Sequence, residues 1–337
     1  MRAPGVNFLR VIRFSSNPIA FSRKRKKLLN PYISIPKLNL FSRLTIREFY
    51  GFSKDAFAPE PDPRILFLTE NVREVWNSIL SGIGQRKGFL LLTGEKGMGK
   101  TTLISLIYLY LATNSRQVKV IPLFDLPQKI EDIVQALLSG LGLPPKEESE
   151  SRMFSRLEWD LTQRSARGEI VALIIDEAQN LRRETLEKIR FLAQPSPKIP
   201  NLLQEVFVGD PQFEEDLRSK DLSFLNQRIE VRCRLRPFTP EESLGYIEHR
   251  LKKAGSTTSR VFTPRAVSLI AQTAGGNPGT LSHICEEALS VGYNQFKERI
   301  DPANIREILA KLGMEKEHGW LFPLKTMPWI KKSLGKS

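Results

Sequence analysis

Short apolar runs alternate with amphipathic stretches up to about residue 237. From Thr69 the apolar residues recur at spacings of three and four, which predicts a helix that ends near Gly84. Buried strands that alternate with helices are typical of a parallel sheet covered on both faces, so the pattern predicts a three-layer α/β fold. The predicted strands lie at residues 88–93, 118–123, 170–175, 202–208 and 229–235.

After residue 237 the pattern is that of helices alone. Residues 239–242, Thr-Pro-Glu-Glu, combine a capping box with a proline at the first helical position and predict a helix that stops near Gly255. A similar cap-plus-proline start occurs at residues 263 and 301, and residues 278–296 supply another helix. We expect an α/β domain followed by a small all-helical domain. The expected boundaries are 48–237 for the α/β domain and 238–315 for the helical domain.

The two chain ends carry the positive charge. The chain has 51 Lys+Arg and 37 Asp+Glu, a formal net charge of +14. Residues 1–47 contain 11 Lys or Arg and no acid, and residues 318–337 contain four Lys and no acid. Between residues 48 and 317 there are 36 basic and 37 acidic side chains. The body is therefore near neutral, and the excess belongs to a basic N-terminal extension, 1–47, and a basic C-terminal tail, 316–337.

Several interpretations of the N-terminal extension remain open. Its run Ser-Arg-Lys-Arg-Lys-Lys at residues 22–27 suits a disordered, solvated extension. It also suits an arm for nucleic acid, anionic lipid or an acidic partner, or an organelle transit peptide. The most apolar stretch, residues 103–112, is about half of what a bilayer span requires, so we expect no integral membrane segment.

A glycine-rich motif follows the first predicted strand. Residues 94–101, Gly-Glu-Lys-Gly-Met-Gly-Lys-Thr, match the phosphate-loop pattern G-x-x-x-x-G-K-S/T and open a predicted helix. The N–H groups of such a loop turn around phosphate oxygens, and the helix N-terminus adds its positive end. We expect Lys100 to contact the β- and γ-phosphates and Thr101 to ligate Mg²⁺. The predicted nucleotide-binding residues are Gly94, Glu95, Lys96, Gly97, Met98, Gly99, Lys100, Thr101 and Thr102.

Two acidic residues end the third predicted strand. Asp176 and Glu177 follow the apolar run 170–175, and ligands bind at the carboxyl ends of strands in open α/β sheets. We expect Asp176 to hold Mg²⁺ through water and Glu177 to orient and deprotonate an attacking water. The second acid favours hydrolysis over transfer to a small substrate. The alternative is an acidic cap on the helix that follows.

Arg228 lies just before the fifth predicted strand. It is either a catalytic arginine that reaches the γ-phosphate of a neighbouring subunit or an ordinary surface residue, and the residues alone leave the two alternatives even. The three histidines, His249, His283 and His318, lack the spacing of a metal site, and the two cysteines exclude a disulfide framework.

Taken together, these motifs resemble those of the AAA+ ATPases of the ExeA/GspA type, over about residues 48–312. The resemblance implies a sheet with a helical lid, ATP bound at a subunit boundary, assembly into a ring or filament, and the role of arginine finger for Arg228. The segments that carry it are Phe49-Tyr50-Gly51-Phe52 with Pro61-Asp62-Pro63-Arg64, the phosphate loop, Asp176-Glu177-Ala178-Gln179-Asn180-Leu181, and Gln227-Arg228-Ile229 leading to Gly275-Gly276-Asn277-Pro278.

Two positions depart from the family pattern. Asp210 stands where the family usually has Gln, and a carboxylate near phosphate is disfavoured by repulsion unless it turns away or meets a cation. Gly279 stands where the lid normally has its sensor arginine. These departures imply slow hydrolysis, or substitution by a nearby base such as Arg265. Longer family members add a membrane helix and a cell-wall-binding domain, which we do not carry over to this sequence.

We therefore expect an ATP hydrolase that binds Mg-ATP, self-associates, and assembles, remodels or positions an unidentified protein partner. The resemblance implies a setting in secretion, in the cytoplasm or peripherally at the inner membrane. The alternative is a DNA-associated adaptor similar to the TniB/MuB-type transposition ATPases, which would contact DNA through the N-terminal extension. A third reading is a nucleotide-binding scaffold that barely hydrolyses ATP.

Overall fold

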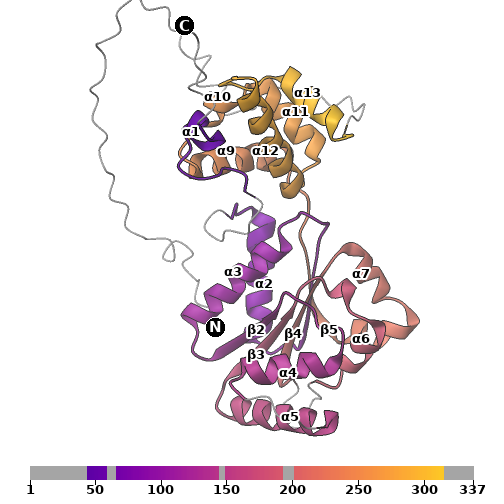
Figure 1. Cartoon of the computed structure of the whole chain (residues 1–337). Helices are drawn as coiled ribbons and strands as arrows, with labels where there is room; N and C mark the ends of the chain where they lie inside the picture. Colours follow the sequence, from indigo (N-terminus) through magenta and orange to yellow (C-terminus); the bar gives the residue numbers. More distant parts are fainter. Residues whose placement is uncertain (1–43, 59–65, 144–148, 193–200, 315–337) are drawn as a thin grey trace, which may run out of the picture. The chain divides into compact units, whose positions relative to one another are not determined.

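A computed structural model describes residues 44–58, 66–143, 149–192 and 201–314 (Figure 1). Within these ranges one sheet has the strand order β2-β3-β4-β1-β5, and every neighbouring pair is parallel. The predicted strand ends agree with the observed ones to within one residue, and the predicted parallel α/β fold is confirmed. The strands are β1 (Phe89–Thr93), β2 (Val118–Leu123), β3 (Ile170–Ile175), β4 (Leu203–Gly209) and β5 (Ile229–Arg234).

Different helices cover the two faces of the sheet (Figure 1). One face packs against α2 (Glu70–Gly84) and α3 (Lys100–Asn114). The opposite face is covered by α4 (Ile130–Gly140), α5 (Glu150–Ala166), α6 (Arg183–Ile189), α7 (Pro211–Asp216) and α8 (Ser223–Arg228). Because both faces are dry, the inner strands are apolar at nearly every position and show no alternation with polar residues.

The helical lid consists of α9 (Pro240–Lys253), α10 (Thr258–Val261), α11 (Pro264–Ala274), α12 (Pro278–Asn294) and α13 (Pro302–Lys311). Four of these helices begin with a cap residue followed by proline. The cap side chains of Thr239, Thr263, Asn277 and Asp301 each accept a hydrogen bond from a backbone N–H in the first turn. Proline fits there because its missing N–H would have no helical partner.

The segment before residue 59 belongs to the core of the lid. Helix α1 (Ile46–Tyr50) begins this stretch. Tyr50, Phe52 and Phe57 are buried in the apolar cluster of the lid. Tyr50 also donates a hydrogen bond to Lys297 O at 3.1 Å. The expected boundary at residue 48 assigned this stretch to the α/β domain, whereas its side chains pack in the other core.

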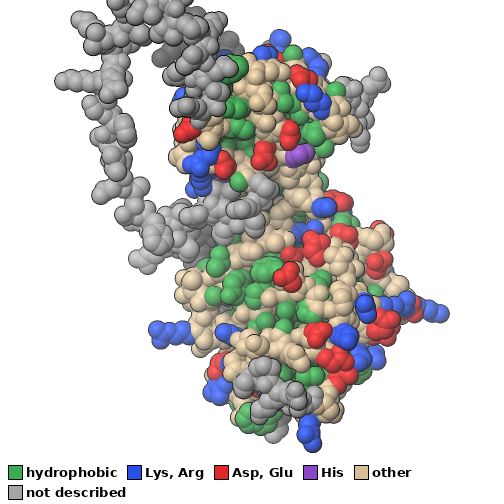
Figure 2. Space-filling view, viewed as in Figure 1, with side chains coloured by type: hydrophobic (Ala, Val, Ile, Leu, Met, Phe, Trp, Pro, Cys, Tyr) green, Lys and Arg blue, Asp and Glu red, His purple; other side chains and the backbone are tan. Residues whose placement is uncertain are grey.

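Charged side chains of both signs are interspersed over the face shown in Figure 2. The basic runs at the two chain ends, including residues 22–27, and the segment 61–64 lie outside the described residues. In the parts of the chain that the structure describes, no helix has both the length and the apolar character to span a membrane.

Replacing Tyr50 with Ala should destabilise the lid, because the ring is only 3% exposed. We expect a loss of roughly 3–5 kcal/mol in the free energy of unfolding, as for other buried aromatic residues. Chemical denaturation measures it. Trp159→Ala is the control, because Trp159 is 64% exposed and its loss should cost less than about 0.5 kcal/mol. Equal effects of the two substitutions would contradict the assignment of Tyr50 to the lid core.

Candidate functional site

The predicted phosphate loop connects β1 to α3 at the carboxyl edge of the sheet. Gly97 and Gly99 have φ of +85° and +84°, the left-handed region that favours glycine. Gly99 occupies the cap position of α3 and makes no side-chain hydrogen bond there. The first N–H groups of α3 therefore have no side-chain acceptor, and an anion is the partner that such a helix start prefers.

Side chains of the two predicted motifs meet beside this loop. Lys100 is buried, and its Nζ donates to Gly94 O at 2.8 Å and to Glu95 O at 3.3 Å. Thr101 Oγ1 donates to Asp176 Oδ2 at 2.6 Å, although the two residues are 75 positions apart. The fold thus brings together the hydroxyl and the carboxylate that the sequence predicted as Mg²⁺ ligands.

The Thr101–Asp176 pair fits a magnesium ion. Burial raises the pKa of Asp176, while the hydrogen bond from Thr101 and the charge of Lys100 oppose that rise. A bound divalent cation would favour the ionised form of this buried carboxylate. Hydroxyl and carboxylate oxygens are also among the ligands that Mg²⁺ takes, usually with substrate phosphates.

Glu177 directly follows Asp176 and has an unusual backbone conformation. Its φ of +50° and ψ of 42° are uncommon for a residue other than glycine. Its backbone N–H donates to Asp176 Oδ1 at 2.9 Å, its carboxylate accepts from Gln179 Nε2, and the residue lines a cavity beside the loop. Unusual backbone conformations of this kind concentrate at functional sites.

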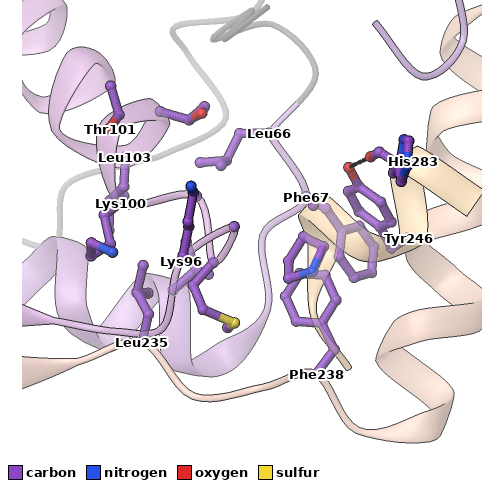
Figure 3. A pocket seen from close by; sticks show the side chains of 18 of the residues that line it. Leu66, Phe67, Lys96, Lys100, Thr101, Leu103, Leu235, Phe238, Tyr246 and His283 are labelled. Carbon is purple, nitrogen blue, oxygen red and sulfur yellow. Dashed lines mark hydrogen bonds between the residues drawn. The ribbon is translucent and has the colours of Figure 1, made fainter. Parts of the chain in front are cut away.

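The cavity has a volume of about 370 Å³ and extends from the phosphate loop to the lid. Figure 3 shows Lys100 and Thr101 at one end and Phe67, Phe238 and Tyr246 at the other. The three aromatic rings lie 5.6 to 6.1 Å apart between centroids. A polar end and an aromatic end match the phosphates and the base of a nucleotide.

Arg250 fixes the aromatic end. It is buried, and its guanidinium donates to Ala56 O at 2.7 Å, to Ala58 O at 3.0 Å and to Tyr246 Oη at 3.1 Å. The Tyr246 hydroxyl is also 2.7 Å from Ser282 Oγ. The sequence analysis missed this group; the spacing of four between Tyr246 and Arg250 on one helix was the available signal.

Most predicted nucleotide-binding residues line the cavity, namely Lys96, Gly97, Met98, Gly99, Lys100, Thr101 and Thr102. Gly94 and Glu95 are not among the lining residues and instead supply the carbonyl acceptors of Lys100.

The two departures from the family pattern have structural explanations. Asp210 Oδ1 accepts from Phe213 N at 2.9 Å, so this carboxylate caps α7, and Asp210 is not among the described residues that line the cavity. Gly279 lines the cavity at the start of α12. Arg265, the expected substitute for the missing arginine, is exposed in the first turn of α11 and is absent from the described cavity lining.

Arg228 lies at the opposite edge of the sheet. The next residue, Ile229, pairs with Phe89 at the start of β1, whereas the phosphate loop follows the end of β1. The guanidinium of Arg228 stacks 4.3 Å from the centroid of the Phe89 ring, and its Nη1 donates to Arg190 O at 3.2 Å. The structure therefore does not bring Arg228 together with Lys100 in one subunit.

Glu205 is a buried acid that the sequence analysis also missed. It pairs with Phe89 across the sheet and is fully buried, and among the residues that the structure describes neither of its carboxylate oxygens has a hydrogen-bond partner. Burial raises the pKa of Glu205 to about 8, and the positive charge of Arg228 opposes that rise. Below that pH the Glu205 carboxyl is therefore neutral, although it lies within reach of the charge of Arg228.

Comparisons with known proteins agree with this geometry. A family model described as AAA domain matches residues 83–217. General secretion pathway protein A of Aeromonas hydrophila is 30% identical over 255 residues, which are 75% of this chain and 46% of that protein. The chain thus contains an AAA domain. It spans less than half the length of the curated relatives that it matches.

Solved structures share the fold of this AAA+ chain. Cdc6p from Pyrobaculum aerophilum superimposes with a TM-score of 0.59 and 18% identity, over 76% of this chain and 70% of that one. The Aeropyrum pernix ORC2 protein gives a TM-score of 0.56 and 18% identity, over 77% and 72%. The AAA+ fold predicted for the chain, with its helical lid, is confirmed.

Glu205→Gln should make stability less dependent on pH. The folded pKa of about 8 lies above the ordinary value of 4.5, so the folded state binds this proton more tightly. Stability should fall as pH rises from about 4.5 to 8, by at most about 1.4 kcal/mol per pH unit. We measure the free energy of unfolding by chemical denaturation between pH 5 and 8.5. The stability of the variant should rise relative to that of the wild type as pH rises. Equal pH dependence of the two free energies would contradict this prediction.

Proposed function

We propose that this AAA+ chain binds Mg-ATP in the cavity and hydrolyses it. The observation that carries the proposal is the Thr101–Asp176 hydrogen bond beside a helix start without a side-chain cap and beside the buried ammonium of Lys100. These groups provide a cation site and anion-binding donors within one corner of the cavity. The aromatic end suits the base.

Each side chain has a definite part in the proposed reaction. Lys100 exchanges its two carbonyl partners for phosphate oxygens, and the first N–H groups of α3 hold the phosphates in place. Thr101 and Asp176 would hold a Mg²⁺ ion, which when bound would neutralise charge at the phosphates. Glu177 orients a water molecule and accepts its proton as the water attacks the γ-phosphate.

A second subunit completes the site in this proposal. Arg228 faces the sheet edge opposite its own phosphate loop, and Gly279 supplies no side chain where a lid arginine is expected. An arginine contributed by a neighbour would stabilise the charge that develops on the γ-phosphate. Self-association into a ring or filament therefore makes hydrolysis depend on assembly.

We further propose that this cycle drives the assembly, remodelling or positioning of a protein partner in secretion. The support is the similarity to General secretion pathway protein A. The proposed location is the cytoplasm or the surface of the inner membrane. The alternative of a DNA-associated adaptor depends on the N-terminal extension, of which residues 1–43 lie outside the described residues. The face seen in Figure 2 shows no continuous basic surface to which DNA could bind.

Lys100→Ala and Glu177→Gln should fail in different ways. Lys100→Ala removes the ammonium that meets the phosphates and should abolish nucleotide binding. Glu177→Gln leaves the phosphate-binding groups intact, so it should bind ATP as the wild type does and lose roughly 100-fold or more in turnover. Calorimetry with a nonhydrolysable analogue and a phosphate-release assay measure the two effects. Equal ATP affinity of wild type and Lys100→Ala would refute the proposal.

Mixing inactive variants tests whether Arg228 acts on a neighbour. Arg228→Ala and Glu177→Gln should each be nearly inactive alone. In mixed assemblies a subunit with an intact Glu177 can meet an intact Arg228 from the other variant, so phosphate release should recover in part. Arg232→Ala, an exposed arginine on the adjacent strand, is the control and should keep its activity. Absence of recovery in assemblies shown to be mixed would count against a shared site.

A further inference from the structure

The lid touches the phosphate loop directly through the start of α12. Asn277 Nδ2 donates to Lys96 O at 2.8 Å, and Gly279 N donates to Gly97 O at 3.0 Å. The lid therefore binds the two carbonyl groups in the middle of the loop, about 180 positions away along the chain.

These two segments approach each other closely. A Cβ on Gly97 would lie 2.6 Å from Asn277 Oδ1, and a Cβ on Gly279 would lie 3.0 Å from the Cα of Gly97. A larger residue at position 97 would therefore displace the Asn277 side chain, and one at position 279 would crowd the loop backbone.

The two contacts bear on how the loop presents its donors. In a trans peptide the C=O of one residue and the N–H of the next point in opposite directions. Holding Lys96 O against the lid therefore turns the N–H of Gly97 away from Asn277. The lid thus sets the orientation of a loop peptide that has the conformational freedom of glycine.

We propose that Asn277 is a positioning residue that couples the lid to the phosphate loop, in place of the missing lid arginine. This proposal rests on the proposed function, because it takes the ligand of the loop to be a nucleotide. Asn277 acts through the loop backbone: with the contact made, the loop is preorganised for phosphate and the lid is held over the cavity. When the contact is lost, the loop is no longer preorganised and the lid is no longer held over the cavity.

Asn277 has two separable tasks, which allows a clean experiment. Its Oδ1 caps α12 by accepting from Thr280 N at 3.1 Å, while its Nδ2 makes the contact with the loop. Asn277→Ser and Asn277→Asp keep a cap acceptor and remove the amide donor. Thr263→Ala is the matched control, because it removes the cap of the neighbouring lid helix α11 and no contact with the loop.

The position of the lid is measured first, without nucleotide. Spin labels at the exposed positions Ala112→Cys on α3 and Ala310→Cys on α13 report the lid-to-sheet distance in the full chain. We expect a broader, longer distance distribution for Asn277→Ser and Asn277→Asp, and the wild-type distribution for Thr263→Ala. Unchanged distributions in both Asn277 variants, or the same broadening in the control, would overturn the proposal.

Nucleotide affinity is measured second. Asn277→Ser should bind a nonhydrolysable ATP analogue roughly 3- to 10-fold more weakly than wild type, the effect of losing one hydrogen bond, and Thr263→Ala should bind it normally. Wild-type affinity in Asn277→Ser would refute the coupling. A wild-type chain that binds no nucleotide would instead refute the proposed function, while the distance measurement would still test the lid contact.

Discussion

The parallel sheet is the constraint on which the rest of the molecule depends. In a parallel sheet every strand ends at the same edge, so the loops after β1 and β3 must meet there although β4 lies between those strands. Thr101 and Asp176 form their hydrogen bond at this edge. The apolar residues that bury both faces of the sheet thereby position these two polar side chains.

The lid gives the cavity its second wall. Phe238 and Tyr246 come from the lid and its approach, and Phe67 comes from the segment before α2. The buried guanidinium of Arg250 ties the chain before residue 59 to this wall. A buried charge is costly without full hydrogen bonding, and the carbonyl groups of Ala56 and Ala58 provide it.

The far edge of the sheet is built differently from the site edge. Arg228 rests on an aromatic ring, next to a carboxyl group that burial keeps neutral below about pH 8. In the proposed shared site, the phosphate loop at one edge of the sheet and Arg228 at the other would meet across a head-to-tail interface.

The sequence by itself determined the local features. Strand runs and proline-started helices follow from short-range rules, so the strand ends were predicted to within one residue and the helix starts from their cap residues. The two nucleotide motifs are local patterns of the same kind. Three features depended on contacts between distant segments. The aromatic wall joins residues from three segments, the Asn277 contact spans the lid and the loop, and the aromatic motif at residues 49–52 packs into the lid. No periodicity specifies which core a buried residue joins, because that choice is made by packing between elements; only the tertiary structure decided it.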